Sequence, residues 1–268
     1  MEFKIFNVNH GFCAVVLDQD HVTMIDCGHD GNSTPLTWLF NNGYKHIDTL
    51  IISNFDQDHI SDIKTLKNYF TFDRLVVNPT ISANNLKLIK KKNGYITEQM
   101  NILCNIINEL QCVPVNYKTM NMQFNFFWIK YPYELDTNNL SIVTFIKFGS
   151  STILYPSDIE NVAWRRLLES TDFLDQLKKV NIFIASHHGR ENGYCKEVFN
   201  HCNPEMVIIS DQEREFSTQN HDLYSQHARG INFGTIFAPK HRKVLTTRSD
   251  GNIKIYNQNN KCYIEYGG

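Results

Sequence analysis

A short polar segment, Ser53 to Asp62, carries the residue types that bind divalent metals in proteins. It reads S-N-F-D-Q-D-H-I-S-D and follows the apolar, β-branched run Thr49 to Ile52. Its potential ligands are Asn54, Asp56, Asp58 and His59. Alternate residues of an extended chain face the same side, so the first three should converge, with the histidine arriving from the turn. Carboxylates with imidazole suit zinc, manganese or iron. A helix N-terminus rich in acidic residues is the alternative interpretation.

Polar residues also follow other apolar runs. Ile153 to Tyr155 leads into Pro156-Ser157-Asp158, and Ile182 to Ala185 leads into Ser186-His187-His188-Gly189. The polar segment Glu215 to His221 ends in another histidine. Asp158 alone would serve equally well as a helix cap. Three apolar runs are each followed by Asp or His residues, however, and this combination indicates a metal centre on the edge of a rigid sheet.

The elements that position these residues alternate between strand and helix patterns. Strands are predicted at 3–8, 14–17, 22–25, 49–53, 75–77, 113–117, 124–130, 142–148, 153–155, 182–185, 206–210, 244–246 and 253–256. Helices are predicted at 35–42, 60–69, 162–168 and twice within 84–110, with a break near Asn93-Gly94. Many strands with interspersed helices, and no Rossmann-like unit, predict two sheets covered by helices.

Composition narrows the classes of partner. The chain has 268 residues and a formal net charge of −2, so no global basic field attracts nucleic acid or an anionic membrane. Basic runs at 87–92 and 240–243 are either solvated surface or local nucleic-acid contacts. The seven cysteines form no C-x-x-C pair, which favours reduced thiols. Without a secretion signal or a membrane-spanning apolar stretch, a cytoplasmic protein with no membrane association is expected.

The order of the motifs resembles the metallo-β-lactamase superfamily, and in particular the hydrolase domain of ComEC-like competence proteins and their stand-alone relatives. The resemblance runs along nearly the whole chain. The segments that carry it are Asn7 to Gly11, Met24 to Gly28, Ile47 to Ser53, Asn139 to Val143, Leu154 to Asp158, Ser186 to Gly189 and Thr247 to Ile253.

This resemblance implies an α+β fold: a single domain, residues 1–268, forming an αββα sandwich of two mixed sheets with helices on both outer faces. It also implies that the superfamily loop H-x-H-x-D-H is Asn54 to His59 here, with both leading histidines replaced. One metal position then keeps Asp58, His59, Asp158 and either His187 or His188. The other keeps only Asp56, Asp158 and Asn54.

The altered loop predicts an oxygen-rich first position that favours Mn²⁺, Mg²⁺ or Fe²⁺ over zinc. We therefore expect a divalent metal cofactor, Mn or Zn, with one ion as an alternative to two. The expected catalytic residues are Asp58, His59 and Asp158. The expected residues around the metal or substrate are Asp26, Arg190 and His221.

Two functions from different classes follow. The first is a metal-dependent hydrolase, a phosphodiesterase or nuclease acting on nucleic acid or a nucleotide. The second is a degenerate domain of the same fold that binds or regulates a protein partner in a multi-protein assembly, such as one for antiviral defence. Hydrolysis of a thioester or lactam is a third interpretation, which the missing histidines disfavour.

Overall fold

Strands with apolar side chains on both faces build the centre of the protein. The computed structural model describes residues 1–29, 35–92, 94–110, 116–212, 221–235 and 238–267. In β8 (Ile142–Phe148), Ile142 and Ile146 point into one hydrophobic cluster, whereas Val143 and Phe145 point into another. Successive side chains of a strand face opposite sides, so such a strand must be covered on both faces.

Two seven-stranded mixed sheets provide these layers. The first sheet has the order β16-β15-β1-β2-β3-β4-β5, with β3, β4 and β5 parallel. Its strands are β1 (Glu2–Ile5), β2 (Ala14–Asp18), β3 (His21–Ile25), β4 (His46–Ile51), β5 (Thr71–Val76), β15 (Ile253–Gln258) and β16 (Lys261–Tyr266).

The second sheet has the order β14-β11-β10-β9-β8-β7-β6, and its strands from β9 to β14 run parallel. Besides β8, its strands are β6 (Tyr117–Lys118), β7 (Met122–Trp128), β9 (Ser151–Tyr155), β10 (Ile182–Ile184), β11 (Met206–Ile209) and β14 (Val244–Thr246). A separate hairpin pairs β12 (Ile231–Thr235) with β13 (Ala238–Arg242).

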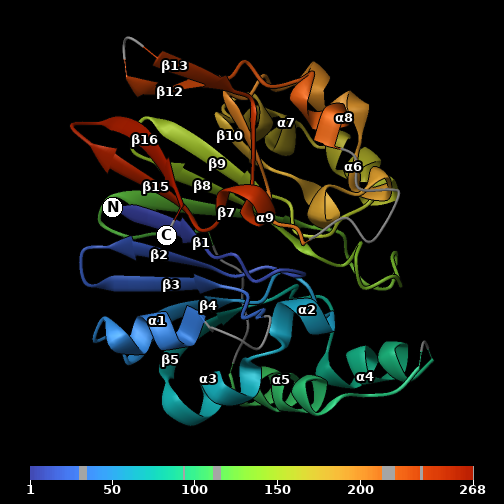
Figure 1. Cartoon of the computed structure of the whole chain (residues 1–268). Coiled ribbons are helices and arrows are strands. Elements are labelled where there is room, and N and C mark those ends of the chain that lie inside the picture. The colour runs from blue at the N-terminus through green and yellow to red at the C-terminus, as the bar shows by residue number, and fades with distance from the viewer. Residues whose placement is uncertain (30–34, 93, 111–115, 213–220, 236–237, 268) are drawn as a thin grey trace.

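Helices cover the outer face of each sheet, as Figure 1 shows. On the first sheet lie α1 (Pro35–Asn41), α2 (Gln57–Ile60), α3 (Ile63–Tyr69), α4 (Ala83–Lys92) and α5 (Glu98–Glu109). On the second lie α6 (Asn161–Leu168), α7 (Thr171–Leu177) and α8 (His221–Ser225), and α9 (Thr247–Asp250) follows β14. The predicted αββα sandwich of two mixed sheets is therefore confirmed. None of the helices in the described segments is both long enough and apolar enough to cross a bilayer.

The observed elements differ from the prediction at a few places. The predicted helix 60–69 is divided into α2 and α3, because the amide of Asp62 bonds the carbonyl of Cys27 and draws the chain toward β3. Helices α7, α8 and α9, strand β16 and the β12–β13 hairpin were not predicted. Most of the predicted strand 113–117, Asn93, Cys112 and the segment 215–220 lie outside the described residues.

Candidate metal centre

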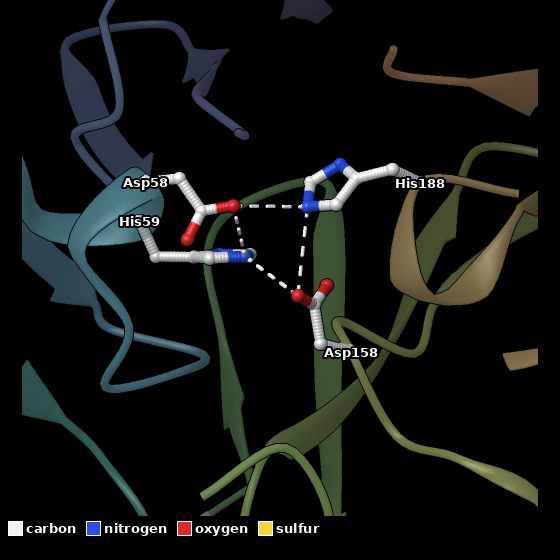
Figure 2. A group of neighbouring side chains, drawn as sticks. All are labelled: Asp58, His59, Asp158 and His188. Atoms are coloured by element: carbon white, nitrogen blue, oxygen red, sulfur yellow. Dashed lines mark ion pairs between the residues drawn. The ribbon is translucent and has the colours of Figure 1, made fainter. Parts of the chain in front are cut away.

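Four side chains meet at the edge where the parallel strands of both sheets end. Asp58 and His59 come from α2, Asp158 follows β9, and His188 lies in the 3₁₀ turn Ser186–Gly189 after β10. One ligand atom of each lies within 4.8 Å of the others, and the four side chains point toward a common centre (Figure 2). Parallel strands present their carboxyl ends at one edge, which explains how loops far apart in sequence converge.

The individual distances place both imidazoles against both carboxylates. His188 Nε2 lies 3.2 Å from Asp58 Oδ2 and 3.5 Å from Asp158 Oδ2. His59 Nε2 lies 3.2 Å from Asp158 Oδ2 and 3.8 Å from Asp58 Oδ2. Three of the side chains are buried, while that of Asp58 is 19% exposed. The centre is therefore closed on the protein side and open beside Asp58.

The hydrogen-bond partners of the two histidines fix the role of each ring nitrogen. His188 Nδ1 lies 2.9 Å from the backbone carbonyl of Ser210, an acceptor, so Nδ1 carries the proton. His59 Nδ1 lies 2.8 Å from the Asp26 carboxylate and likewise donates. Both Nε2 atoms are buried without a hydrogen-bond partner. In the neutral tautomer each Nε2 lone pair faces carboxylate oxygens, an arrangement that a cation between them would stabilise.

The mutual attraction of these carboxylates and imidazoles shifts their pKa values. Burial works to lower the pKa of His188, but the negative charges of Asp158 and Asp58 beside its ring raise it to about 10. Burial works to raise the pKa of Asp158, yet His59 and His188 hold it well below its usual range. Two ionised carboxylates thus attract positive charge to this point, and the donor set of two carboxylates and two imidazoles fits a divalent metal.

Asp26 holds the His59 ring through the nitrogen that faces away from the centre. Its side chain is fully buried and accepts four hydrogen bonds: Ser53 N at 2.7 Å, Ser53 Oγ at 2.5 Å, and His59 Nδ1 and Tyr155 Oη at 2.8 Å each. These partners come from the ends of β4 and β9 and from α2. Asp26 therefore connects both sheets to the metal-facing histidine, as an outer partner of a ligand does.

The backbone around the centre is strained. Positive φ angles occur at Asp26 (58°), Ser157 (57°), His187 (49°) and His188 (55°). Non-glycine residues adopt this left-handed conformation at a cost of order 1 kcal/mol each, and it persists where the surroundings enforce it. Such strain is concentrated here at the ends of β3, β9 and β10, which is typical of a functional site.

Two predicted ligands of the metal loop lie in other interactions. Asp56 Oδ1 forms an ion pair with Lys90 and accepts a hydrogen bond from Thr137 Oγ1 at 3.1 Å. Asn54 Nδ2 donates to Ser141 Oγ at 3.0 Å, and its Oδ1 accepts from the amide of Asp56 at 2.6 Å. Neither belongs to the group of four. The predicted convergence through strand alternation fails for both residues because β4 ends at Ile51, before either of them.

The neighbouring histidine faces the rim rather than the centre. His187 Nδ1 lies 3.4 Å from Glu160 Oε1, and its Nε2 lies 3.3 Å from a guanidinium nitrogen of Arg190. His188, not His187, is therefore the late histidine of the cluster. Arg190 contacts His187, and its contact with substrate stays a prediction.

His221 belongs to a separate polar group. Its Nε2 lies 2.9 Å from Asp211 Oδ2, and Arg248 lies 3.4 Å from its ring. Asp211 follows Ser210, whose carbonyl bonds His188, so this group adjoins the support of the centre. The structure does not bring His221 to the four clustered side chains.

Sequence reasoning missed two residues beside the centre. His10 Nε2 lies 3.3 Å from Asp58 Oδ2, and its ring centroid lies 4.9 Å from that of His188. Asn9 and Gly11 on either side have positive φ angles of 55° and 112°, which turn this loop toward α2. Lys90, which pairs with Asp56, was treated only as part of a basic run. The N-V-N-H-G motif was the available signal for His10.

Comparisons with known proteins are consistent with this architecture. No protein-family profile matches the chain. It is 22% identical over 180 residues, 67% of its length, to ComE operon protein 3 of Bacillus subtilis (strain 168). The chain spans only 22% of the length of that relative.

Solved structures resemble almost the whole chain. The metallo-β-lactamase fold protein YhfI from Bacillus subtilis has a TM-score of 0.52 at 13% identity, with 99% of each chain covered. A diphosphatase of the PhnP family has a TM-score of 0.53 at 10% identity, covering 96% of this chain and 98% of its own. Igni18, a metallo hydrolase from Ignicoccus hospitalis, has a TM-score of 0.51 at 10% identity, covering 96% and 100%. The chain therefore has the metallo-β-lactamase fold.

Proposed function

We propose that this protein is a metal-dependent hydrolase and that its substrate is a phosphodiester in a nucleic acid or a nucleotide. The observation that carries the proposal is the pair of buried Nε2 atoms, on His59 and His188, that lack a partner and face two carboxylates. Asp58, His59, Asp158 and His188 would hold the ion. The similarity in fold to a diphosphatase and to the metallo hydrolase Igni18 supports a hydrolase.

Each residue of the centre has a distinct part in this proposal. A divalent cation held there supplies Lewis acidity and a source of hydroxide at neutral pH. Asp58 is the exposed member, and its pKa is lowered by His59 and His188 against the opposing effect of burial. It therefore remains a carboxylate that accepts a hydrogen bond from an attacking water and orients it. Asp158 and the two imidazoles hold their positions through buried contacts.

Positive charge at the rim supports an anionic substrate. Arg190 lies beside His187, and Lys90 pairs with Asp56. A guanidinium presents several donors in a plane that matches phosphate oxygens. Arg190 would thus bind and orient a phosphoryl group.

The alternative is a domain that binds a partner without catalysis. One observation favours it: Asp56, a candidate ligand of the metal loop, is occupied by Lys90 instead. A protein partner, such as a component of a defence assembly, would then use the same surface without hydrolysis.

Metal analysis and a hydrolysis assay distinguish the two functions. Purified protein should contain a stoichiometric divalent ion and hydrolyse bis-p-nitrophenyl phosphate with added Mn²⁺ or Zn²⁺. Asp58→Ala and Asp158→Asn should each reduce the rate at least ~100-fold, because both weaken the centre. Asp175→Asn is the matched control and should keep the wild-type rate, because the Asp175 carboxylate on α7 is exposed and pairs only with the solvent-exposed Lys178 among the ion pairs of the described residues. Protein without ion or hydrolysis would support the binding function.

A further inference from the structure

The candidate ligands in the metal loop and its neighbours divide into two kinds. His59 and His188 each have a buried ligand atom without a hydrogen-bond partner. Asn54 and Asp56 have side-chain atoms that are already paired with protein groups. A preformed metal site leaves its lone pairs unpaired, whereas a ligand position that is not used for metal is satisfied internally.

The contacts of Asp56 explain how its charge is balanced. Its Oδ1 forms an ion pair with the ammonium of Lys90 and accepts a hydrogen bond from the hydroxyl of Thr137. The side chain of Lys90 is only 18% exposed and that of Asp56 is 34% exposed, so water screens this pair incompletely. An ammonium is a compact cation with three donors and no acceptor. It provides the positive charge and the directed contacts that an ion would otherwise provide at this carboxylate.

We propose that Lys90 takes the place of a second cation beside Asp56, so that the centre binds one divalent ion rather than two. This inference rests on the proposed metal centre and specifies its stoichiometry. Lys90 is a positioning residue in this role: it holds Asp56 and excludes a competing ion. The single ion lies among Asp58, His59, Asp158 and His188.

The space around the ion pair is suited to a test. Asp56, Lys90, Gly94, Tyr95 and Thr137 line an open cavity of about 330 Å³. That volume holds several waters, each of about 30 Å³ in the liquid. Mn²⁺ and Mg²⁺ bind readily through one or two carboxylates while they keep several of their waters. Removal of the ammonium would leave the Asp56 carboxylate free, beside a cavity that admits a hydrated cation.

The variants separate charge from position. Lys90→Ala and Lys90→Met both remove the ammonium, the second while retaining the aliphatic chain, and Lys90→Arg keeps a cation. Lys92→Ala is the matched control, since Lys92 is an exposed lysine in the same last turn of α4. Circular dichroism establishes that each variant is folded. Mn²⁺ binding is measured by equilibrium dialysis with elemental analysis and by electron paramagnetic resonance of the bound ion.

Wild type, Lys90→Arg and Lys92→Ala should each bind one Mn²⁺ per chain. Lys90→Ala and Lys90→Met should bind a second, with at least tenfold weaker affinity, and show the line broadening of two neighbouring Mn²⁺ ions. Two ions in the wild type, or a single ion in both neutral Lys90 variants, would overturn the inference while leaving the hydrolase proposal intact. A wild type that binds no ion would overturn both.

Discussion

Replacement of Asp26 by asparagine should reduce both the stability of the protein and its affinity for metal. The asparagine side chain retains one carbonyl oxygen, which keeps the bond from the Ser53 amide. Its NH₂ group then faces the three donors that Oδ2 accepts in the wild type, from Ser53 Oγ, Tyr155 Oη and His59 Nδ1. The hydroxyl groups can rotate and accept a hydrogen bond from the side-chain NH₂, whereas the imidazole Nδ1–H cannot.

The magnitude follows from this imbalance. A hydrogen bond to a charged group contributes about 1.5–3 kcal/mol, and rotation of the two hydroxyls recovers part of the loss, so unfolding should become easier by about 2–4 kcal/mol. His59 restores its bond only by moving its proton to Nε2, the atom that faces Asp158 at 3.2 Å. That tautomer cannot ligate a metal through Nε2, so metal affinity should fall by about 10–100-fold.

Urea unfolding in the presence of chelator measures the first effect, and competition with a chromophoric chelator measures the second. Tyr155→Phe is the matched control, because it removes one donor from Asp26 while preserving the ring stacked on Phe12 at 4.0 Å. We expect it to cost about 1.5–3 kcal/mol, the contribution of one hydrogen bond to a carboxylate, and to leave metal affinity within about threefold of the wild type. Unchanged metal affinity in Asp26→Asn, or an equal loss in Tyr155→Phe, would refute the tautomer argument.

Three further perturbations have defined outcomes. Gly11→Ala should destabilise the protein by at least about 2 kcal/mol in urea unfolding and weaken metal binding, because φ is 112° and the new Cβ would lie 2.2 Å from the Asp58 carbonyl oxygen; wild-type stability would contradict this. Burial works to raise the pKa of Asp18, but hydrogen bonds from Asn121 and Thr119 lower it overall. The stabilisation by the Asp18 carboxylate is therefore complete above the ordinary aspartate pKa of about 4, and it disappears as pH falls through the lower pKa of the folded state. The free energies of unfolding of wild type and Asp18→Asn should thus approach each other from about pH 6 to about pH 2. A constant difference would exclude Asp18 as the cause. Removal of metal by chelation should lower the melting temperature, because an ion at a free concentration of 100 times its Kd stabilises the folded protein by about 2.7 kcal/mol. An unchanged melting temperature would argue against a bound ion.

Most of the fold could be predicted because its strands are strongly patterned. The run Ile142–Phe148 was predicted with its observed bounds, since both of its faces are apolar. The strand Lys261–Tyr266 was missed because it lies at a sheet edge, with side chains that alternate only between exposed and half-buried. Short edge elements carry a weak hydrophobic signal, so sequence alone identifies them poorly.

The candidate site was predictable to the extent that it depends on strand ends. Asp158 and His188 follow the adjacent parallel strands β9 and β10, and Asp58 and His59 follow β4 of the other sheet; all four lie together. Lys90 could not be assigned, because its pairing with Asp56 joins residues 34 positions apart on separate elements. Local periodicity holds no information on such a contact, which depends on how α4 packs beside the metal loop.

The four clustered side chains differ in how freely they can adjust. Both imidazole rings are anchored through Nδ1, one to Asp26 and the other to the carbonyl of Ser210. The Asp58 carboxylate borders solvent, and its contacts include the rings of His59 and His188 in the cluster and of His10 beside it. Ions of different radius must therefore be accommodated mainly by rotation of a carboxylate, against two nitrogen atoms in fixed positions. Selectivity among metals would then follow from the angle between two immobile lone pairs, a property set by the strand ends rather than by the ligands themselves.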